Sequence, residues 1–166
     1  RFQALIGHGA GYGVYTKLKE TAGSDVNYLF NIDPISIWLA NPKALAPELL
    51  PVIEMIGAEY QKAKPDTTIR SAHVGMAASN TYLLMTQVLP RAIKQYGGVD
   101  AEALRKATMD VDLPEGGTML GFGAKFKGEG DPVAGQNERA FPVIVQYIDD
   151  KSYVVWPKSL QQREPV

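Results

Sequence analysis

The chain has no cysteine among its 166 residues. This absence excludes disulfides, zinc sites built on thiolates and cysteine nucleophiles. It leaves the compartment open, because a protein without thiols suits an oxidising periplasm as well as a cytosol. Long apolar runs are absent too, since the stretches Tyr82–Met85 and Pro142–Val145 are far too short to cross a bilayer. We therefore expect no membrane insertion of this segment.

An excess of charge of one sign is also missing. The chain has 17 basic and 18 acidic residues, a formal net charge of −1, and no basic stripe with interleaved aromatic residues. Because no cluster of basic residues is available to neutralise phosphates, nucleic acid is not an expected partner. Apolar content of 45% and charged content of 21% are ordinary for a globular protein, and the length suits one domain.

The residue types that serve catalysis and metal binding form no usable pattern. The two histidines, His8 and His73, have no helix-spaced partner, so no metal site is expected. We interpret His73 as structural or exposed. No serine lies in a G-x-S-x-G frame, and Asp110 and Asp112 are typical of a solvated turn rather than of paired catalytic carboxylates. We expect no catalytic residues, no metal and no cofactor.

The first thirty residues predict a strand, a helix and a second strand. The apolar run Phe2–Ile6 leads into a glycine-rich loop at 7–13 and is typical of a buried strand. Helical spacing follows over Val14–Thr21, with Gly23 as the residue that ends the helix. Asn27–Ile32 is the second buried strand. Because parallel strands need such a crossover helix, the pattern predicts an α/β fold.

The middle of the chain predicts three helices in succession. The first covers Leu49–Ala63 and the second Ala77–Tyr96, which Pro90 should kink because its ring removes a backbone donor. The third covers Ala101–Met109, with Asp100 as its N-cap.

The last fifty residues predict short strands and a hairpin. We expect β-like pieces at Thr118–Phe122 and Ala124–Phe126, then a surface loop at Gly128–Asn137. Pro142–Ile148 and Ser152–Trp156 then flank a polar turn, which indicates an antiparallel hairpin. This order suits a chain that leaves one lobe, builds part of another and returns.

The glycine-rich loop allows three interpretations. A dinucleotide fingerprint would need a glycine where Tyr12 stands, with Asp33 as the ribose-binding acid at a loosely fitting distance. Alternatively, the glycines serve only a tight strand-to-helix turn. In the third interpretation the loop lines a ligand cleft, because such clefts lie at the carboxyl ends of parallel strands. The residues alone leave all three open.

Four landmarks stand out along the chain: the strand and loop Ala4–Tyr12, the strand into Asp33-Pro34, the helix Leu49–Ala63 followed by a helix that begins near Met76, and the tail Gly135–Tyr147 with Tyr153–Pro157. Together they resemble the substrate-binding components of branched-chain amino-acid type ABC transporters, the Leu/Ile/Val-binding family. The tail is the most specific piece. The likeness spans essentially the whole chain and corresponds to the C-terminal portion of a typical member.

The resemblance implies a type I periplasmic-binding-protein-like fold. Its lobes are Rossmann-like, with parallel sheets flanked by helices, and both lobes would contribute in part. Residues 1–33 would be part of the second lobe, and residues 34–125 a mostly helical part of the first. Residues 126–166 would form a crossing loop and a terminal hairpin that returns to the second lobe. One interlobe crossing is expected near Asn31–Ile35 and another within Gly121–Phe141.

The resemblance also implies a function, that of the extracytoplasmic solute-binding component of an ABC importer, which is not an enzyme. Its partners would be a small-molecule solute and the permease subunits. The protein would be periplasmic, or membrane-anchored outside a bacterium that lacks an outer membrane, after loss of a signal peptide. Alternatives are a ligand-sensing regulatory domain of the same fold and a nucleotide-binding oxidoreductase domain.

The first residue, Arg1, lies within an apparent strand and is not an initiator methionine, so we expect a fragment or a processed product. Open sheet edges in such a piece favour self-association.

The resemblance implies a ligand site on the loop and the second strand, formed by His8, Gly9, Gly11, Tyr12, Asn31 and Asp33. His8 and Tyr12 would give polar or stacking contacts, the glycines backbone N–H groups, and Asp33 a contact near the hinge. Family members often place an acid two positions beyond the strand-ending glycine, where this chain has Gly9. Without that partner for a ligand ammonium, the sequence favours an organic acid, aromatic by preference, over an α-amino acid.

Overall fold

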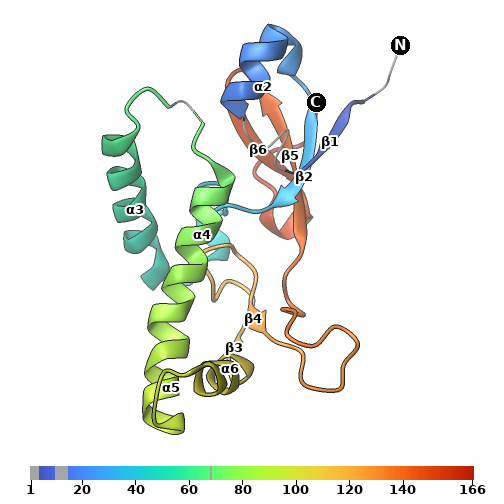
Figure 1. The fold of residues 1–166 in the computed structure, drawn as a ribbon. Coiled ribbons are helices and arrows are strands. Elements are labelled where there is room, and N and C mark those ends of the chain that lie inside the picture. Colours follow the sequence, from blue (N-terminus) through green and yellow to red (C-terminus); the bar gives the residue numbers. More distant parts are fainter. Residues whose placement is uncertain (1–3, 10–14, 68) are drawn as a thin grey trace.

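A four-stranded sheet forms one end of the molecule in the computed structural model, which describes residues 4–9, 15–67 and 69–166 (Figure 1). Its strands are β1 (Ile6–His8), β2 (Phe30–Pro34), β5 (Pro142–Ile148) and β6 (Lys151–Trp156), in the order β1-β2-β5-β6. The pair β1–β2 is parallel, whereas β2–β5 and β5–β6 are antiparallel. The predicted α/β fold is confirmed, with a sheet that is mixed rather than wholly parallel.

The crossover between the two parallel strands is the helix α2 (Tyr15–Ala22). Gly23 follows it with a φ of +56°, a left-handed conformation that glycine adopts easily, so this residue ends the helix as predicted. Tyr15 packs on Tyr147 of β5 with ring centroids 4.9 Å apart, and its hydroxyl donates to Asp150 at 2.6 Å. These contacts fix α2 against the sheet.

Four helices make up most of the middle of the chain: α3 (Leu50–Ala63), α4 (Ala72–Leu83), α5 (Leu89–Tyr96) and α6 (Ala101–Met109). The second predicted helix thus begins earlier than expected, at Ala72. The kink predicted at Pro90 takes the form of a π-helical turn, Leu84–Val88, between α4 and α5. Because Pro90 has no N–H to donate, the regular α-helical bonding cannot continue through it. Short 3-10 turns occupy Gly23–Val26, Pro42–Ala44, Pro47–Leu49 and Lys158–Leu160.

Helix α4 lies unusually close to the segment that follows β2, because Gly75 has no side chain. A Cβ atom at Gly75 would stand 2.1 Å from Ser36 Oγ and 2.9 Å from Trp38 Nε1. Trp38 Nε1 also donates to the carbonyl oxygen of Ser71, at 2.9 Å. The N-terminal half of α4 is therefore held beside the end of the sheet.

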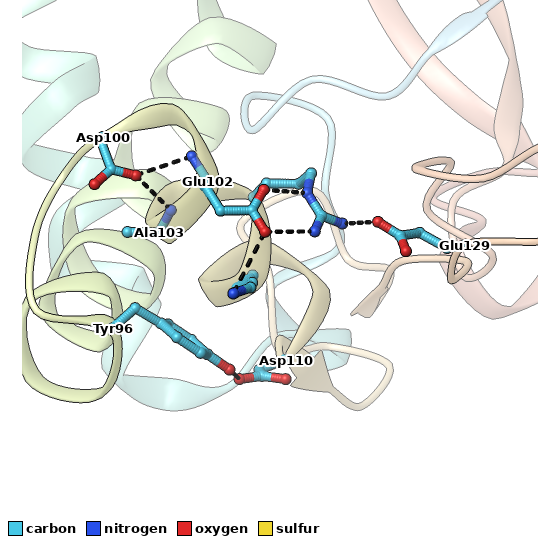
Figure 2. Close-up of polar contacts among 8 residues, drawn as sticks. Tyr96, Asp100, Glu102, Ala103, Asp110 and Glu129 are labelled. Atoms are coloured by element: carbon cyan, nitrogen blue, oxygen red, sulfur yellow. Dashed lines mark hydrogen bonds and ion pairs between the residues drawn. The ribbon is translucent and has the colours of Figure 1, made fainter.

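The start of α6 is capped as the sequence predicts. One carboxylate oxygen of Asp100 accepts hydrogen bonds from the backbone N–H groups of Glu102 (3.0 Å) and Ala103 (2.9 Å), as Figure 2 shows. The Glu102 carboxylate pairs with Arg105 and Lys106, and these bonds lower its pKa to about 2. Since these groups are exposed, the cap contributes more to the stability of α6 than the ion pairs do.

Two short strands, β3 (Asp112–Leu113) and β4 (Ala124–Lys125), pair in a second, antiparallel sheet. The prediction of a β-like piece at Thr118–Phe122 is wrong, because this segment folds back on itself. Thr118 Oγ1 donates to the carbonyl oxygen of Phe122 at 2.6 Å, and Gly121 has a φ of +87°. The predicted loop at Gly128–Asn137 is largely exposed.

The predicted terminal hairpin is confirmed. Asp149 and Asp150 join β5 to β6 with positive φ values of 48° and 60°, the backbone geometry that matches the twist of paired strands. Pro34, the last residue of β2, pairs in register with Pro142, the first residue of β5. The chain therefore leaves this sheet and returns to it at adjacent positions.

The apolar interior has two clusters. The larger joins the sheet to the segment after β2 and to residues 119–122, with Ile35, Met119, Val143, Val154 and Leu160 at its centre. The smaller lies between α5 and α6 and includes Val88, Ala92, Ala103, Ala107 and Val111. Figure 1 shows α5 and α6 at the end of the molecule opposite the sheet. Across the described ranges, no helix combines the length and apolarity that a membrane span needs.

Candidate functional site

The carboxyl ends of β1 and β2 bring three of the predicted site residues to one edge of the sheet. His8 is paired with Ile32 in the parallel register, and Asp33 follows Ile32 directly. His8 is exposed, whereas Asn31 and Asp33 are buried, with 2% and 6% of their surfaces exposed. Because Asn31 and Asp33 are two residues apart on a strand, their side chains lie on the same face.

Gly9 opens the loop after β1. Its φ of +66° is a conformation that side chains disfavour, and its N–H donates to the carbonyl oxygen of Ile32 at 3.0 Å. That N–H group is thus used within the protein. Among the described residues, no atom lies within 4 Å of where a Cβ of Gly9 would be. Gly11 and Tyr12 lie outside the described residues.

The buried pair Asn31 and Asp33 is only partly satisfied. Asn31 Nδ2 donates to Asp33 Oδ2 at 3.5 Å, a long bond, and Asn31 Oδ1 has no partner among the described residues. Burial raises the pKa of the Asp33 carboxyl above its ordinary value. Three effects lower this pKa in part: the charge of His73, the hydrogen bond from Asn31 and the charge of His8. The two histidines of the chain therefore stand near this one carboxyl.

Tyr147 of β5 completes the cluster. Burial, and then the neighbouring Asp33 carboxylate, raise the pKa of its phenol to about 12, while a hydrogen bond with the Asn31 side chain lowers it in part. The phenol therefore keeps its proton at neutral pH and remains a hydrogen-bond donor.

A small cavity, called the polar cavity below, opens beside these side chains. Its volume is about 20 Å³, and it is lined by Asn31, Asp33, Pro34, Leu39, Ile69, Arg70, Ala72, Val145, Tyr147 and Ser152. Such a space holds about one water molecule or the polar end of a larger ligand. Its lining joins the end of β2 to the segment that precedes α4, so a ligand group placed here contacts both parts of the molecule.

Sequence reasoning missed Arg70, His73 and Tyr147. They come from segments far along the chain from β2, and no local spacing marks them. His73 was expected to be structural or exposed, and it lies half-buried in the first turn of α4, close enough to Asp33 to lower the pKa of that carboxyl. The early start of α4 at Ala72 is what carries this residue to the site.

The side chains at the strand ends offer hydrogen-bond donors and acceptors. In the described part of the chain, no three or more His, Cys, Asp or Glu side chains form a group able to hold a metal ion. A separate hollow of about 430 Å³ lies between α4 and the segments 118–126 and 137–142, lined mainly by apolar side chains such as Met76, Leu83, Phe122 and Phe141. Asn31 and Asp33 line the polar cavity and not this apolar hollow, and His8 lines neither.

Comparisons with known proteins find relatives along nearly the whole chain. Leu/Ile/Val-binding protein homolog 7 of Brucella suis biovar 1 (strain 1330) is 28% identical over 154 residues, which are 93% of this chain and 34% of that protein. Leu/Ile/Val-binding protein homolog 8 of Brucella abortus (strain 2308) is 28% identical over 156 residues, 94% of this chain and 34% of that protein. No family model matches the chain.

The mixed α/β sheet and these relatives agree on the fold class, an α/β fold with a sheet that contains parallel strands. Within that class the relatives support the Leu/Ile/Val-binding protein family, which confirms the resemblance drawn from the sequence. The chain spans about a third of the length of these relatives.

Proposed function

We propose that the chain is part of an extracytoplasmic solute-binding protein that captures a small organic solute and delivers it to an ABC importer. The observation that carries the proposal is the buried side chain of Asn31 at the carboxyl end of β2, whose Oδ1 has no partner among the described residues and whose Nδ2 makes a long bond to Asp33. Buried polar groups are normally paired, so an acceptor without a partner beside a cavity suits a site completed by a ligand.

The site would work by closure of two lobes. We assign residues 1–33 to the second lobe, 34–125 to the first, and 126–166 to the crossing loop and the returning hairpin. The register pair of Pro34 and Pro142 supports this division, because both crossings then lie side by side and can bend together. A solute that contacts both lobes favours the closed state by the free energy of those extra contacts, and no covalent chemistry is needed.

The solute that we propose is an organic acid, aromatic by preference. Gly9 puts no carboxylate beside the loop, and His8 and His73 each carry an N–H that can donate to a solute carboxylate. The relatives are named for leucine, isoleucine and valine, so an α-amino acid is the competing solute. The ammonium of that solute would find acceptors in Asp33 and in Asn31 Oδ1.

Titration calorimetry with leucine, succinate and benzoate distinguishes the two solutes. We expect an organic acid to bind and leucine to bind at least tenfold more weakly, because each lost charge-assisted hydrogen bond weakens binding by about that factor or more. The variant His8→Gln should weaken binding of the acid, while Lys43→Gln, an exposed change away from the strand ends, should not. A clear preference for leucine would overturn the choice of solute, and no binding of any of the three would count against the function.

A further inference from the structure

Arg70 is a cation without an anionic partner. Its guanidinium lies over the ring of Trp38, with its central carbon 5.1 Å from the ring centroid. In the described part of the chain it makes neither an ion pair nor a hydrogen bond, although the side chain is only half-exposed. An arginine in such a position keeps all its N–H donors available, and arginine is suited to bind a carboxylate through two of them at once.

The guanidinium is held in a fixed orientation. Trp38 is anchored through its Nε1–H to Ser71 and packs on Tyr60, with ring centroids 5.6 Å apart. On the other side Gly57 leaves room, since a Cβ at Gly57 would stand 3.0 Å from Arg70 Nη1. The donors are therefore placed before any ligand arrives, which lowers the entropic cost of binding.

A hollow of about 400 Å³ opens in front of this pair; we call it the arginine hollow. It is lined by Trp38, Leu39, Gln61, Ile69, Arg70, Asp150, Lys151, Ser152, Tyr153 and Gln162. Its size suits a small organic molecule. Its lining is mainly polar, and Leu39, Ile69 and Tyr153 add a smaller apolar surface.

The charges that line the arginine hollow favour an anion. Arg70 and Lys151 are cationic, while Asp150 is already engaged by Lys19 and by the hydroxyl of Tyr15. Aromatic faces that could attract a cation are taken, because Arg70 covers Trp38 and Arg163 lies over Tyr153 at 5.4 Å. The charge in the hollow therefore disfavours a cationic ligand.

We propose that the arginine hollow binds a small carboxylate with an apolar body. The carboxylate accepts from the Arg70 guanidinium, and the body packs against Leu39, Ile69 and Tyr153. The hollow shares four lining residues with the polar cavity, Leu39, Ile69, Arg70 and Ser152, but does not include His8 or Asp33. The inference therefore does not rest on the function proposed for the strand ends.

Glu54 is the competing partner. It lines a neighbouring hollow of about 450 Å³ that Arg70 and Gly57 also border, but it forms no ion pair with Arg70. If Arg70 formed an ion pair with Glu54 in solution, neutralising either residue would lower the free energy of unfolding by the same amount. No added carboxylate would then bind to Arg70.

Tryptophan fluorescence tests the proposal on the Trp156→Phe chain, where Trp38 is the remaining tryptophan. Benzoate should change the emission of Trp38 saturably, and benzamide, a neutral molecule of the same shape, should bind at least tenfold more weakly. We expect Arg70→Gln to raise the Kd for benzoate at least tenfold. Arg70→Lys keeps the charge but loses the paired N–H donors of the guanidinium, and it should weaken benzoate binding less than Arg70→Gln does. The matched control is Arg91→Gln, on α5 and outside the hollow.

Gly57→Ala separates positioning from charge, because it keeps the cation and displaces the guanidinium. It should weaken benzoate binding while the urea midpoint shows that the chain is folded. Benzoate binding that Arg70→Gln leaves unchanged, or equal affinity for benzamide, would overturn the proposal. Binding lost in His8→Gln but kept in Arg70→Gln would place the carboxylate at the strand ends and would overturn it as well.

Discussion

Asn31 and Asp33 are the buried polar residues of β2, and we place the proposed site around them. Their positions follow from the sequence, because polar residues in an otherwise apolar strand stand out and the carboxyl ends of parallel strands frame ligand sites. Arg70, His73 and Tyr147 could not be found in that way. Each is placed by the packing of a distant segment against β2, and a single sequence does not encode such a contact in its local pattern.

Asp33 makes the stability of the fold depend on pH. Burial raises the pKa of its carboxyl above the ordinary 3.8, so the native state binds more protons than the unfolded state above that pH. The contribution of Asp33 to stability is therefore greatest below pH 3.8 and is lost as the pH rises through the folded-state pKa. We predict that Asp33→Asn loses less stability than the parent chain between pH 4 and about pH 7, as measured by urea unfolding.

The control for this prediction is Asp25→Asn, which removes an exposed carboxyl. The free energy of unfolding of Asp25→Asn should differ between pH 4 and about pH 7 by as much as that of the parent chain does. An Asp33→Asn chain whose stability changed with pH as the parent does would show that this carboxyl is not penalised by burial.

At the scale of elements, the contact of α4 with the segment after β2 sets the geometry of the site. Gly75 allows the contact, and Ser36 Oγ, fully buried, has no hydrogen-bond partner among the described residues. This pair was invisible in the sequence, where a glycine inside a helix indicates only a weaker helix.

We predict that Gly75→Ala destabilises the chain by about 1–3 kcal/mol, because the new methyl group would stand 2.1 Å from Ser36 Oγ. This loss should outweigh the gain of up to about 1 kcal/mol that alanine brings to a helix. The double variant Gly75→Ala/Ser36→Ala should recover part of the stability, since it removes the atom that the methyl group meets. Chemical unfolding of the two single variants and the double variant measures the coupling, and additive effects would contradict it.

Elements with local signals were predicted well. Asp100 caps α6 and the hairpin of β5 and β6 has its turn at Asp149, because capping and turn residues act within a few positions of themselves. The segment Thr118–Phe122 was predicted wrongly, because its apolar residues favour a strand while the bond from Thr118 to Phe122 closes a turn. The start of α4 was also missed, because its first residues are fixed by Trp38 and not by a cap.

At the scale of the whole molecule, an open sheet edge bears on how the chain behaves in solution. β1 is an edge strand, and Leu5 and Ile6 expose 51% and 61% of their surfaces beside it. Such an edge favours pairing with another strand. We predict self-association that grows with concentration in sedimentation velocity, and a shift toward monomer in Ile6→Lys.

Ile93→Lys is the matched control, because Ile93 on α5 is an isoleucine of similar exposure, 58%, away from any sheet edge. It should leave the association unchanged. A chain that stays monomeric at all concentrations, or one in which both lysine variants act alike, would contradict a role for the β1 edge.

The central claim is that the carboxyl ends of β1 and β2 receive the solute. The most direct test is an NMR titration of the isotope-labelled chain with benzoate and with leucine, followed through the backbone amides. We expect saturable shifts at His8, Gly9 and Asn31–Asp33 with at least one of the two probes. Saturable shifts confined to the apolar hollow beside α4, with the strand ends unaffected, would contradict it.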